Sequence, residues 1–414
     1  MDEQRVVVTG MGVVSPIGTG IEEFWRNLIG GKNGISEITH FDATDYASKM
    51  AAEVKGFKPE DWIDRKSADR MDRFTQFSIA SADMAFHDAG LGTREFDHDK
   101  AGVIIGSGVG GAETIESTCV KLHSRGPQSL NPFSISKLII NMSACMVSIR
   151  FGLKGPLAAP AVACSSGVSA IGDAYRILQR GNADIMLAGG SEASITPLAY
   201  GAFCATRSMS RRNDCVHKAS RPFDRDRDGF VMGEGSGIVV LEGLAHARRR
   251  NARIFAELVG YGNTADAYHL TAPEPSGDGA FRVMAAALED AHILPRDVGY
   301  INAHGTSTVL NDKIESAAIE RLFGEHAAHL KVSSIKSMIG HLMGAAGAVA
   351  LISTAMSVQT GLLPPTINLE VPDPDCRLDY VPNKAEKKDV SVALINSFGF
   401  GGGNSCLAVK RYQP

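Results

Sequence analysis

The chain has 414 residues, of which 44% are hydrophobic, and its formal net charge is -4. This balance excludes a general electrostatic affinity for nucleic acid or for an anionic membrane surface. The seven cysteines are odd in number and include no Cys-x-x-Cys pair, which argues against a disulfide framework and a zinc site. The first residues lack the basic segment of a signal peptide, and no apolar stretch of the roughly 18 residues of a membrane span is found. We therefore expect reduced thiols and a cytoplasmic protein without a nucleic-acid or membrane partner.

Short apolar runs alternate along the chain with longer amphipathic or alanine-rich stretches. The apolar runs predict buried strands, and the longer stretches predict helices. Such alternation is typical of a mixed α/β architecture whose sheet is covered on both faces. The expected strands cover residues 5–9, 101–105, 183–188, 237–241, 298–302 and 390–395, and the expected helices cover residues 67–89, 167–179, 280–291, 314–322 and 345–359.

A weak internal duplication is visible in two stretches of small residues. The first begins at Cys164 and leads into a helix that closes at Gly181, and the second begins at His341 and leads into a helix that closes at Gly361. Small residues in the first turns of a helix are expected where the helix packs closely against other backbone. The pattern predicts two similar halves, residues 1–253 with the cysteine and residues 254–414 with the histidines.

Cys164 stands out among the cysteines because it lies at the expected start of a helix. The free N–H groups and the positive end of the helix dipole are expected to lower the pKa of its thiol and to supply donors for an oxyanion. Gly167 leaves space beside the sulfur. The other six cysteines lack this setting, so Cys164 is the predicted nucleophile.

Two histidines and a lysine occur in glycine-flanked motifs of the second half. His304 follows an apolar run at the end of an expected strand, where α/β proteins collect functional groups. Lys336 and His341 flank a short turn that leads into the Ala/Gly-rich helix. No third ligand lies at helical spacing from either histidine, so no metal site is predicted. A thiol, two histidines and a lysine together favour thiolate acyl transfer.

Two other motif matches fail on inspection. The run from Gly10 resembles a dinucleotide fingerprint, but Ser15 replaces the third glycine and Pro16 follows directly. The run from Asp224 opens like a calcium-binding loop, but its acid, Glu234, falls one residue early. No Gly-x-Ser-x-Gly elbow is present, which excludes that route to a serine hydrolase. We interpret the two runs as tight turns and structural charge networks.

The glycine-rich segment 396–404 follows an expected strand near the C-terminus. Phe400 lies between glycines, so its ring has the freedom to swing. Its backbone N–H is positioned by sequence to complete an oxyanion hole with that of Cys164.

Five segments of this sequence, taken together, resemble the β-ketoacyl-acyl-carrier-protein synthases, which include the elongating enzymes of type II fatty-acid synthesis and the ketosynthases of polyketide synthases. The resemblance covers essentially the whole chain. It implies a thiolase-like layered αβαβα fold with two pseudo-symmetric halves, usually as a dimer. The segments are residues 8–18, 220–230, 302–308, 334–341 and 397–402.

The resemblance implies a role for each catalytic position. Cys164 would take an acyl group from a carrier-protein thioester, with the thioester oxygen held by the N–H groups of Cys164 and Phe400. His304 and His341 would stabilise the enolate that forms as a malonyl group loses carbon dioxide, each ring donating from Nε2. Lys336 would orient and polarise the site.

Further positions are implied around this centre. Glu315 would be the buried acid that supports Lys336, and Thr306 and Thr308 would bind the phosphopantetheine arm. Val109 and Phe203 would line the acyl pocket. No tightly bound cofactor is implied, because the substrates are carried on the phosphopantetheine of acyl carrier protein.

The implied partner is an acidic acyl carrier protein, which requires a basic docking rim. Lys66, Arg70 and Arg207 are the predicted docking residues, although Asp69 interrupts a run that is often basic in the family. A homodimer is expected, and a heterodimer with a ketosynthase-like partner that lacks the cysteine is the alternative.

The leading interpretation is a 3-oxoacyl-acyl-carrier-protein synthase of fatty-acid elongation. The alternative is a ketosynthase subunit of a discrete polyketide or polyene synthase. A chain-length or scaffolding subunit of the same fold is disfavoured because such proteins lose the nucleophile, and a dinucleotide-dependent oxidoreductase would need the fingerprint that Ser15 and Pro16 disrupt.

Overall fold

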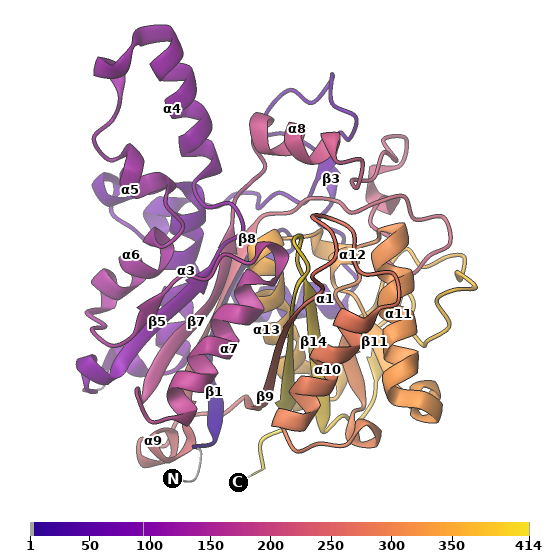
Figure 1. The fold of residues 1–414 in the computed structure, drawn as a ribbon. Helices are drawn as coiled ribbons and strands as arrows, with labels where there is room; N and C mark the ends of the chain where they lie inside the picture. Colours follow the sequence, from indigo (N-terminus) through magenta and orange to yellow (C-terminus); the bar gives the residue numbers. More distant parts are fainter. Residues whose placement is uncertain (1–3, 94, 414) are drawn as a thin grey trace.

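The computed structural model describes residues 4–93 and 95–413, and its centre is one mixed sheet (Figure 1). The strands follow the order β11-β10-β14-β15-β9-β1-β8-β7-β5-β6, with β2 paired to β1. The strands of this sheet are β1 (Val6–Ser15), β2 (Gly18–Thr19), β5 (Ala101–Gly106), β6 (Leu157–Ala158), β7 (Ile185–Glu192), β8 (Gly235–Gly243), β9 (Ala256–Ala265), β10 (Tyr300–Asn302), β11 (Lys331–Ser333), β14 (Val392–Phe398) and β15 (Gly403–Lys410). Two small antiparallel sheets of two strands each are also present. One pairs β3 (Ser36–Glu37) with β4 (Met50–Ala51), and the other pairs β12 (Leu362–Leu363) with β13 (Glu386–Lys387).

The helices surround and divide this sheet. They are α1 (Ile21–Ile29), α2 (Arg65–Ala68), α3 (Arg73–Asp88), α4 (Ala112–Arg125), α5 (Ser134–Leu138), α6 (Met142–Phe151), α7 (Ser166–Gln179), α8 (Pro197–Ala205), α9 (Leu244–Arg249), α10 (Asp278–Asp290), α11 (Val309–Phe323), α12 (Lys336–Ile339) and α13 (Ala346–Thr360). The structure has two helices, α2 and α3, where the sequence predicts one helix over residues 67–89. A new helix starts after Asp72, whose side chain caps α3 by accepting a hydrogen bond from the N–H of Phe74.

The strand order repeats itself on the two sides of the β1–β9 junction. Outward from the junction, β1-β8-β7-β5-β6 corresponds to β9-β15-β14-β10-β11. In each run the first two pairings are antiparallel and the last two are parallel. The predicted internal duplication is therefore visible in the topology of the sheet.

Helices form three layers around the two runs of strands. α3 covers the outer face of β1, β8 and β7, and α10 covers the outer face of β9, β15 and β14. α7 and α13 contact strands of both runs and each other, so they form the middle layer (Figure 1). The predicted α/β fold with a layered αβαβα arrangement is confirmed.

The two middle helices are built alike. Each follows a one-turn 3-10 helix, Ala163–Ser165 before α7 and Met343–Ala345 before α13. The first residue of each turn has a left-handed backbone, with φ of 46° at Ala163 and 45° at Met343. In this correspondence Cys164 matches Gly344, so the two stretches that the sequence aligned at Cys164 and His341 are offset by three residues.

The segment Met343–Thr360 is long and apolar enough to cross a membrane by length and composition, contrary to the expectation from the sequence. In the fold, 83% of this segment is buried, as in the core helix of a globular protein. Its side chains belong to the largest apolar cluster, which also contains Met11, Val168 and Ile395 and so joins both halves.

We predict that Gly167→Ala destabilises the protein although alanine favours helices. A Cβ on Gly167 would meet the carbonyl oxygen of Gly344 at 2.6 Å, and backbone cannot rotate away. The free energy of unfolding should fall by about 2 kcal/mol, the scale of an overpacked core, as measured by urea denaturation.

The matched control is Gly299→Ala, whose Cβ would meet only Val390 methyl groups at 3.4 Å. A Gly167→Ala variant as stable as this control would contradict the close approach of α7 and α13.

Candidate active site

A cavity of about 340 Å³ opens between the two halves, next to the first turns of the middle helices. It is lined by Cys164 from the first half and by His304 and His341 from the second. The three residues are 8%, 3% and 3% exposed, respectively. The structure thus brings the predicted nucleophile and both predicted histidines into one enclosed space.

Cys164 lies in the 3-10 turn before α7, two residues ahead of Ser166, where α7 begins. The turn is clamped to the ends of β14 and β15. The hydroxyl of Ser165 donates to the carbonyl oxygens of Ser397 (2.9 Å) and Gly403 (2.7 Å), and the hydroxyl of Ser397 donates to the carbonyl oxygen of Cys164 (2.9 Å). The sulfur is therefore held in place by a strand pair from the other half.

The two imidazole rings stand at right angles beside the sulfur. Nε2 of His341 lies 3.0 Å from Sγ of Cys164, and the ring centroids of His304 and His341 are 5.4 Å apart at 86°. Burial lowers the pKa of both rings well below the usual value, and the charge of Lys336 lowers it further. Both rings are thus neutral near pH 7. Among the described residues, neither Nδ1 has a hydrogen-bond partner.

Lys336 lies behind the cavity. Its Nζ donates to the carbonyl oxygen of His304 at 2.5 Å, and it does not line the cavity wall. Burial lowers the pKa of this ammonium to about 8, while the charge of Glu315 raises it. Lys336 therefore acts on the site through the backbone of His304 and through its charge.

Glu315 holds the backbone of the histidine segment. Its carboxylate accepts hydrogen bonds from the N–H groups of His304 and Gly305, both at 2.8 Å, and from the side-chain amide of Asn396 at 3.0 Å. No ion pair joins it to Lys336 among the described residues, so its effect on that lysine is through space. Asn396 belongs to this site although the sequence analysis assigned it no role.

The thiol of Cys164 differs from the expectation in its acidity. Burial raises its pKa to about 12, although the ammonium of Lys336 and the backbone N–H groups of Phe400 and Cys164 lower it. The loss of water around the sulfur outweighs these donors, so the prediction of a lowered pKa at the helix start was wrong. Cys164 is a thiol at neutral pH, with the neutral ring of His341 placed to take its proton.

Aromatic rings form part of the cavity wall. Phe400 and Phe203 both line the cavity with ring centroids 6.4 Å apart, and Phe230 packs edge-on against His341 at 5.6 Å. Phe398 packs against His304 at 5.4 Å. The contacts of Phe230 and Phe398 were missed by the sequence analysis, although both residues lie in motifs that it singled out.

Two predicted threonines lie on the way to the cavity mouth. Thr306 and Thr308 both line the cavity, and their hydroxyl oxygens are 3.0 Å apart. Thr308 also caps α11, because its hydroxyl accepts a hydrogen bond from the N–H of Asn311.

Val109 does not line this cavity. It lies half-buried in the loop after β5, where its N–H donates to the carboxylate of Glu192 at 3.3 Å. Glu192 is buried and also binds the N–H groups of Gly108 (2.7 Å) and Gly344 (3.1 Å). Glu192 thus links the loop after β5 in the first half to Gly344 in the second half. The sequence analysis did not identify this link, because one acidic residue at the end of a strand is not a recognisable motif.

The predicted docking residues occupy two places. Arg207 lines the mouth of the cavity. Lys66 and Arg70 surround a separate shallow hollow, where the guanidinium of Arg70 lies 4.6 Å from the ring centroid of Phe133. Within residues 4–93 and 95–413, no group of three or more His, Cys, Asp or Glu residues is arranged to hold a metal ion.

Two family models match the chain. They describe the N-terminal domain of beta-ketoacyl synthases, over residues 3–247, and the C-terminal domain, over residues 255–370. The chain belongs to the beta-ketoacyl synthase family.

Full-length relatives of this β-ketoacyl synthase are named 3-oxoacyl-[acyl-carrier-protein] synthase 2. One from Synechocystis sp. is 50% identical over 413 residues, which cover 100% of this chain and 99% of the relative. Another from Staphylococcus aureus is 50% identical over 410 residues, which cover 99% of each. One chain of a solved complex between a type II polyketide synthase acyl carrier protein and its ketosynthase is 36% identical to this chain, with a TM-score of 0.92 and coverage of 99% of this chain and 100% of that one.

We predict that Lys336→Met slows alkylation of Cys164 by iodoacetamide. The ammonium lowers the pKa of the thiol, so its loss raises that pKa and reduces the thiolate fraction at neutral pH. We expect a decrease of about tenfold near pH 7, measured as carbamidomethylation of Cys164 by mass spectrometry. The difference from the native protein should disappear as the pH rises through about 8, where Lys336 itself loses its proton.

Lys384→Met removes an exposed lysine and serves as the control. Equal alkylation rates for Lys336→Met and this control near neutral pH would show that Lys336 does not govern the sulfur.

Proposed function

We propose that the chain catalyses the decarboxylative condensation of an acyl group on Cys164 with malonyl-acyl-carrier protein, giving β-ketoacyl-acyl-carrier protein in fatty-acid elongation. The observation that carries the proposal is the 3.0 Å contact between Sγ of Cys164 and Nε2 of His341 inside a cavity that also contains His304. The names of the relatives at 50% identity over the full length support it.

The first half-reaction transfers the acyl group to the sulfur. His341 takes the thiol proton as Sγ attacks the carbonyl carbon of an acyl-carrier thioester. The oxyanion accepts hydrogen bonds from the N–H groups of Cys164 and Phe400, both of which already point at the sulfur. The bond to the carrier sulfur breaks, and the proton leaves with the carrier thiol.

The second half-reaction forms the carbon–carbon bond. The malonyl thioester loses carbon dioxide, and the resulting enolate oxygen accepts hydrogen bonds from the Nε2–H groups of the neutral rings of His304 and His341. For this step neutral His341 carries its proton on Nε2, whereas it carries it on Nδ1 when Nε2 takes the thiol proton. The carbanion attacks the acyl carbon on Cys164, the bond to Sγ breaks, and the thiolate is reprotonated. Neutral donors suit this step, because a protonated ring would hold the departing carboxylate in place.

The comparisons favour fatty-acid elongation over the polyketide alternative. Identity is 50% to the two relatives named 3-oxoacyl-[acyl-carrier-protein] synthase 2, and 36% to the polyketide ketosynthase. The nucleophile is present, as a condensing enzyme requires and a chain-length subunit does not.

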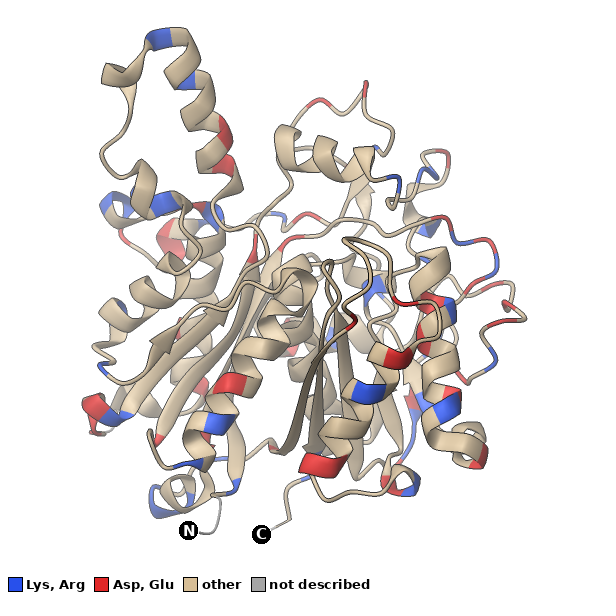
Figure 2. Cartoon of the chain, in the orientation of Figure 1, with Lys and Arg blue, Asp and Glu red and all other residues tan. Residues whose placement is uncertain are grey.

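Acyl carrier protein is the proposed partner, presenting its substrate on phosphopantetheine. Arg207 at the cavity mouth and Lys66 with Arg70 beside Arg65 supply positive charge for an acidic carrier. Figure 2 shows Lys and Arg residues gathered on the ribbon near α5. Thr306 and Thr308 lie between the mouth and the histidines, where a phosphopantetheine arm would pass.

We propose a homodimer formed through the face of α4, α5, α6 and the edge strand β6. Among the described strands β6 ends the sheet and pairs with β5 alone; exposed apolar side chains lie on α4 (Val120), α5 (Ile135), α6 (Ile149) and β6 (Leu157). An exposed edge strand bordered by large apolar side chains favours pairing with another chain.

We also propose that the chain consists of two halves, residues 1–253 and 254–414, and that the protein is located in the cytoplasm. The seven free cysteines support a reducing compartment.

We predict that His304→Ala separates the two half-reactions. Of the two histidines, only His341 has a hydrogen-bond contact with the sulfur in the described part of the chain, so transfer of the acyl group from its carrier protein to Cys164 should persist within about threefold. Loss of one enolate donor should reduce malonyl decarboxylation by about 100-fold or more, measured as carbon dioxide release.

The control is His87→Ala, which removes an exposed histidine on α3. An equal decrease of both half-reactions in His304→Ala would contradict the separate roles of the two rings.

A further inference from the structure

The segment that carries His304 and the two threonines has a strained backbone. Gly305 has φ of 39° and Ser307 has φ of 72°, and Ser307 is fully buried. A serine in the left-handed region costs about 1 to 2 kcal/mol and persists only where the surroundings hold it. The contacts around Ser307 therefore decide where the hydroxyls of Thr306 and Thr308 lie.

Every polar group of Ser307 is bound by a residue outside the segment. Its N–H donates to both carboxylate oxygens of Asp312, at 3.1 and 3.2 Å. Its hydroxyl oxygen accepts from the N–H of Arg221 at 3.0 Å, and its carbonyl oxygen accepts from the N–H of Gly229 at 3.1 Å. Arg221 and Gly229 belong to the charged segment 220–230, which the half-reactions above do not use.

Arg227 of the same charged segment holds the next two residues. Its guanidinium donates to the carbonyl oxygens of Thr308 (3.1 Å) and Val309 (3.0 Å). It also donates to the backbone carbonyl oxygen of Asp224 (2.8 Å) and to the carboxylate of Asp373 (2.5 Å). Its side chain is 1% exposed. Four of its five N–H groups are therefore used in fixed directions, an arrangement that the single ammonium of lysine cannot reproduce.

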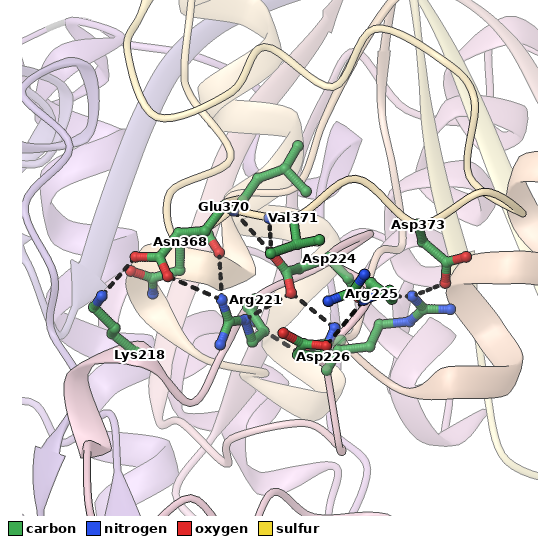
Figure 3. Close-up of polar contacts among 12 residues, drawn as sticks. Lys218, Arg221, Asp224, Arg225, Asp226, Asn368, Glu370, Val371 and Asp373 are labelled. Carbon is green, nitrogen blue, oxygen red and sulfur yellow. Dashed lines mark hydrogen bonds and ion pairs between the residues drawn. The ribbon is translucent and has the colours of Figure 1, made fainter.

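The charged segment is anchored on its other side by residues 368–373. The carboxylate of Asp224 accepts hydrogen bonds from the N–H groups of Glu370 and Val371, both at 2.8 Å, and pairs with Arg221 at 3.1 Å (Figure 3). Figure 3 shows Asp224 between this backbone and Arg221, with Asp373 at the far end of the network. The charged segment therefore holds the backbone of Ser307 and Thr308 and is itself held by the backbone of Glu370 and Val371.

Stability alone does not explain a guanidinium buried at this place. Burial of a charge is costly, and apolar residues of similar volume serve stability as well or better. A planar fork that binds two consecutive carbonyl groups instead gives directional control of the residue that carries them.

We propose that Arg227 is a positioning residue that places the hydroxyls of Thr306 and Thr308 for the phosphopantetheine arm. The inference rests on the proposed function, in which that arm carries the malonyl group. Arg227 touches neither the cavity nor the reacting atoms and acts through the backbone of Thr308.

The test is a comparison of Arg227→Lys with Arg225→Lys. Arg225 lies two residues earlier, and its side chain is exposed and, among the residues that the structure describes, forms an ion pair with Asp226 alone. We expect Arg227→Lys to raise KM for malonyl-carrier protein about tenfold, the scale of one misplaced hydrogen bond, with kcat changed by less than about threefold. With S-ethyl malonyl thioester, which lacks the amides of the arm, kcat/KM should stay within about threefold of the native value. Arg225→Lys should match the native protein with both substrates.

A second variant guards against loss of folding in Arg227→Lys. Asp373→Ala removes the outer anchor of Arg227 and leaves its other contacts, so KM for malonyl-carrier protein should rise about threefold. An unchanged KM for malonyl-carrier protein in both variants would overturn the positioning role. So would a decrease of kcat/KM for S-ethyl malonyl thioester as large as the decrease for malonyl-carrier protein. Failure of the native protein to decarboxylate either substrate would instead overturn the proposed function.

Discussion

The close contact between the first turns of α7 and α13 is the constraint on which the site depends. A Cβ on Gly347 would meet the side chain of Val168 at 2.2 Å, and one on Gly167 would meet the carbonyl oxygen of Gly344 at 2.6 Å. Only glycine allows the two backbones to approach this far. Because Cys164 precedes one of these helices and His341 precedes the other, their approach determines the distance between sulfur and imidazole. The duplicated fold thus produces an asymmetric site, with the nucleophile in one half and the bases in the other.

The same packing excludes water and thereby sets the charges of the site. Burial keeps the Cys164 thiol protonated and both imidazoles neutral, and it lowers the pKa of Lys336 to about 8. The buried ammonium of Lys336 lies behind the cavity, where it is bound to the carbonyl oxygen of His304. Negative charge that develops at the sulfur or at an enolate oxygen meets preorganised N–H donors without the cost of moving solvent.

The fold class, the duplication and the four central residues were predictable, because glycine-flanked Cys, His and Lys motifs and alternating apolar runs are local signals. The acidity of Cys164 was not, since it depends on burial by strands of the other half. Val109 was expected in the cavity, but Glu192 holds the backbone of its loop, and that partner is 83 residues away in the chain. Arg207 was grouped with Lys66 and Arg70 by charge alone, yet the fold separates them. The charged segment 220–230 was interpreted as a structural network, but its contacts with Ser307 and Thr308 appear only in three dimensions.

The most direct test of the central claim is mass spectrometry of the protein after incubation with acyl carrier protein that has been loaded with an acyl group, in the absence of a malonyl donor. The account predicts that the protein gains the mass of one acyl group, that the modified peptide contains Cys164, and that Cys164→Ala gains none. Cys204→Ala, which removes a half-buried cysteine nearby, should be acylated like the native protein. Acylation at another residue, or acylation that persists in Cys164→Ala, would contradict the account.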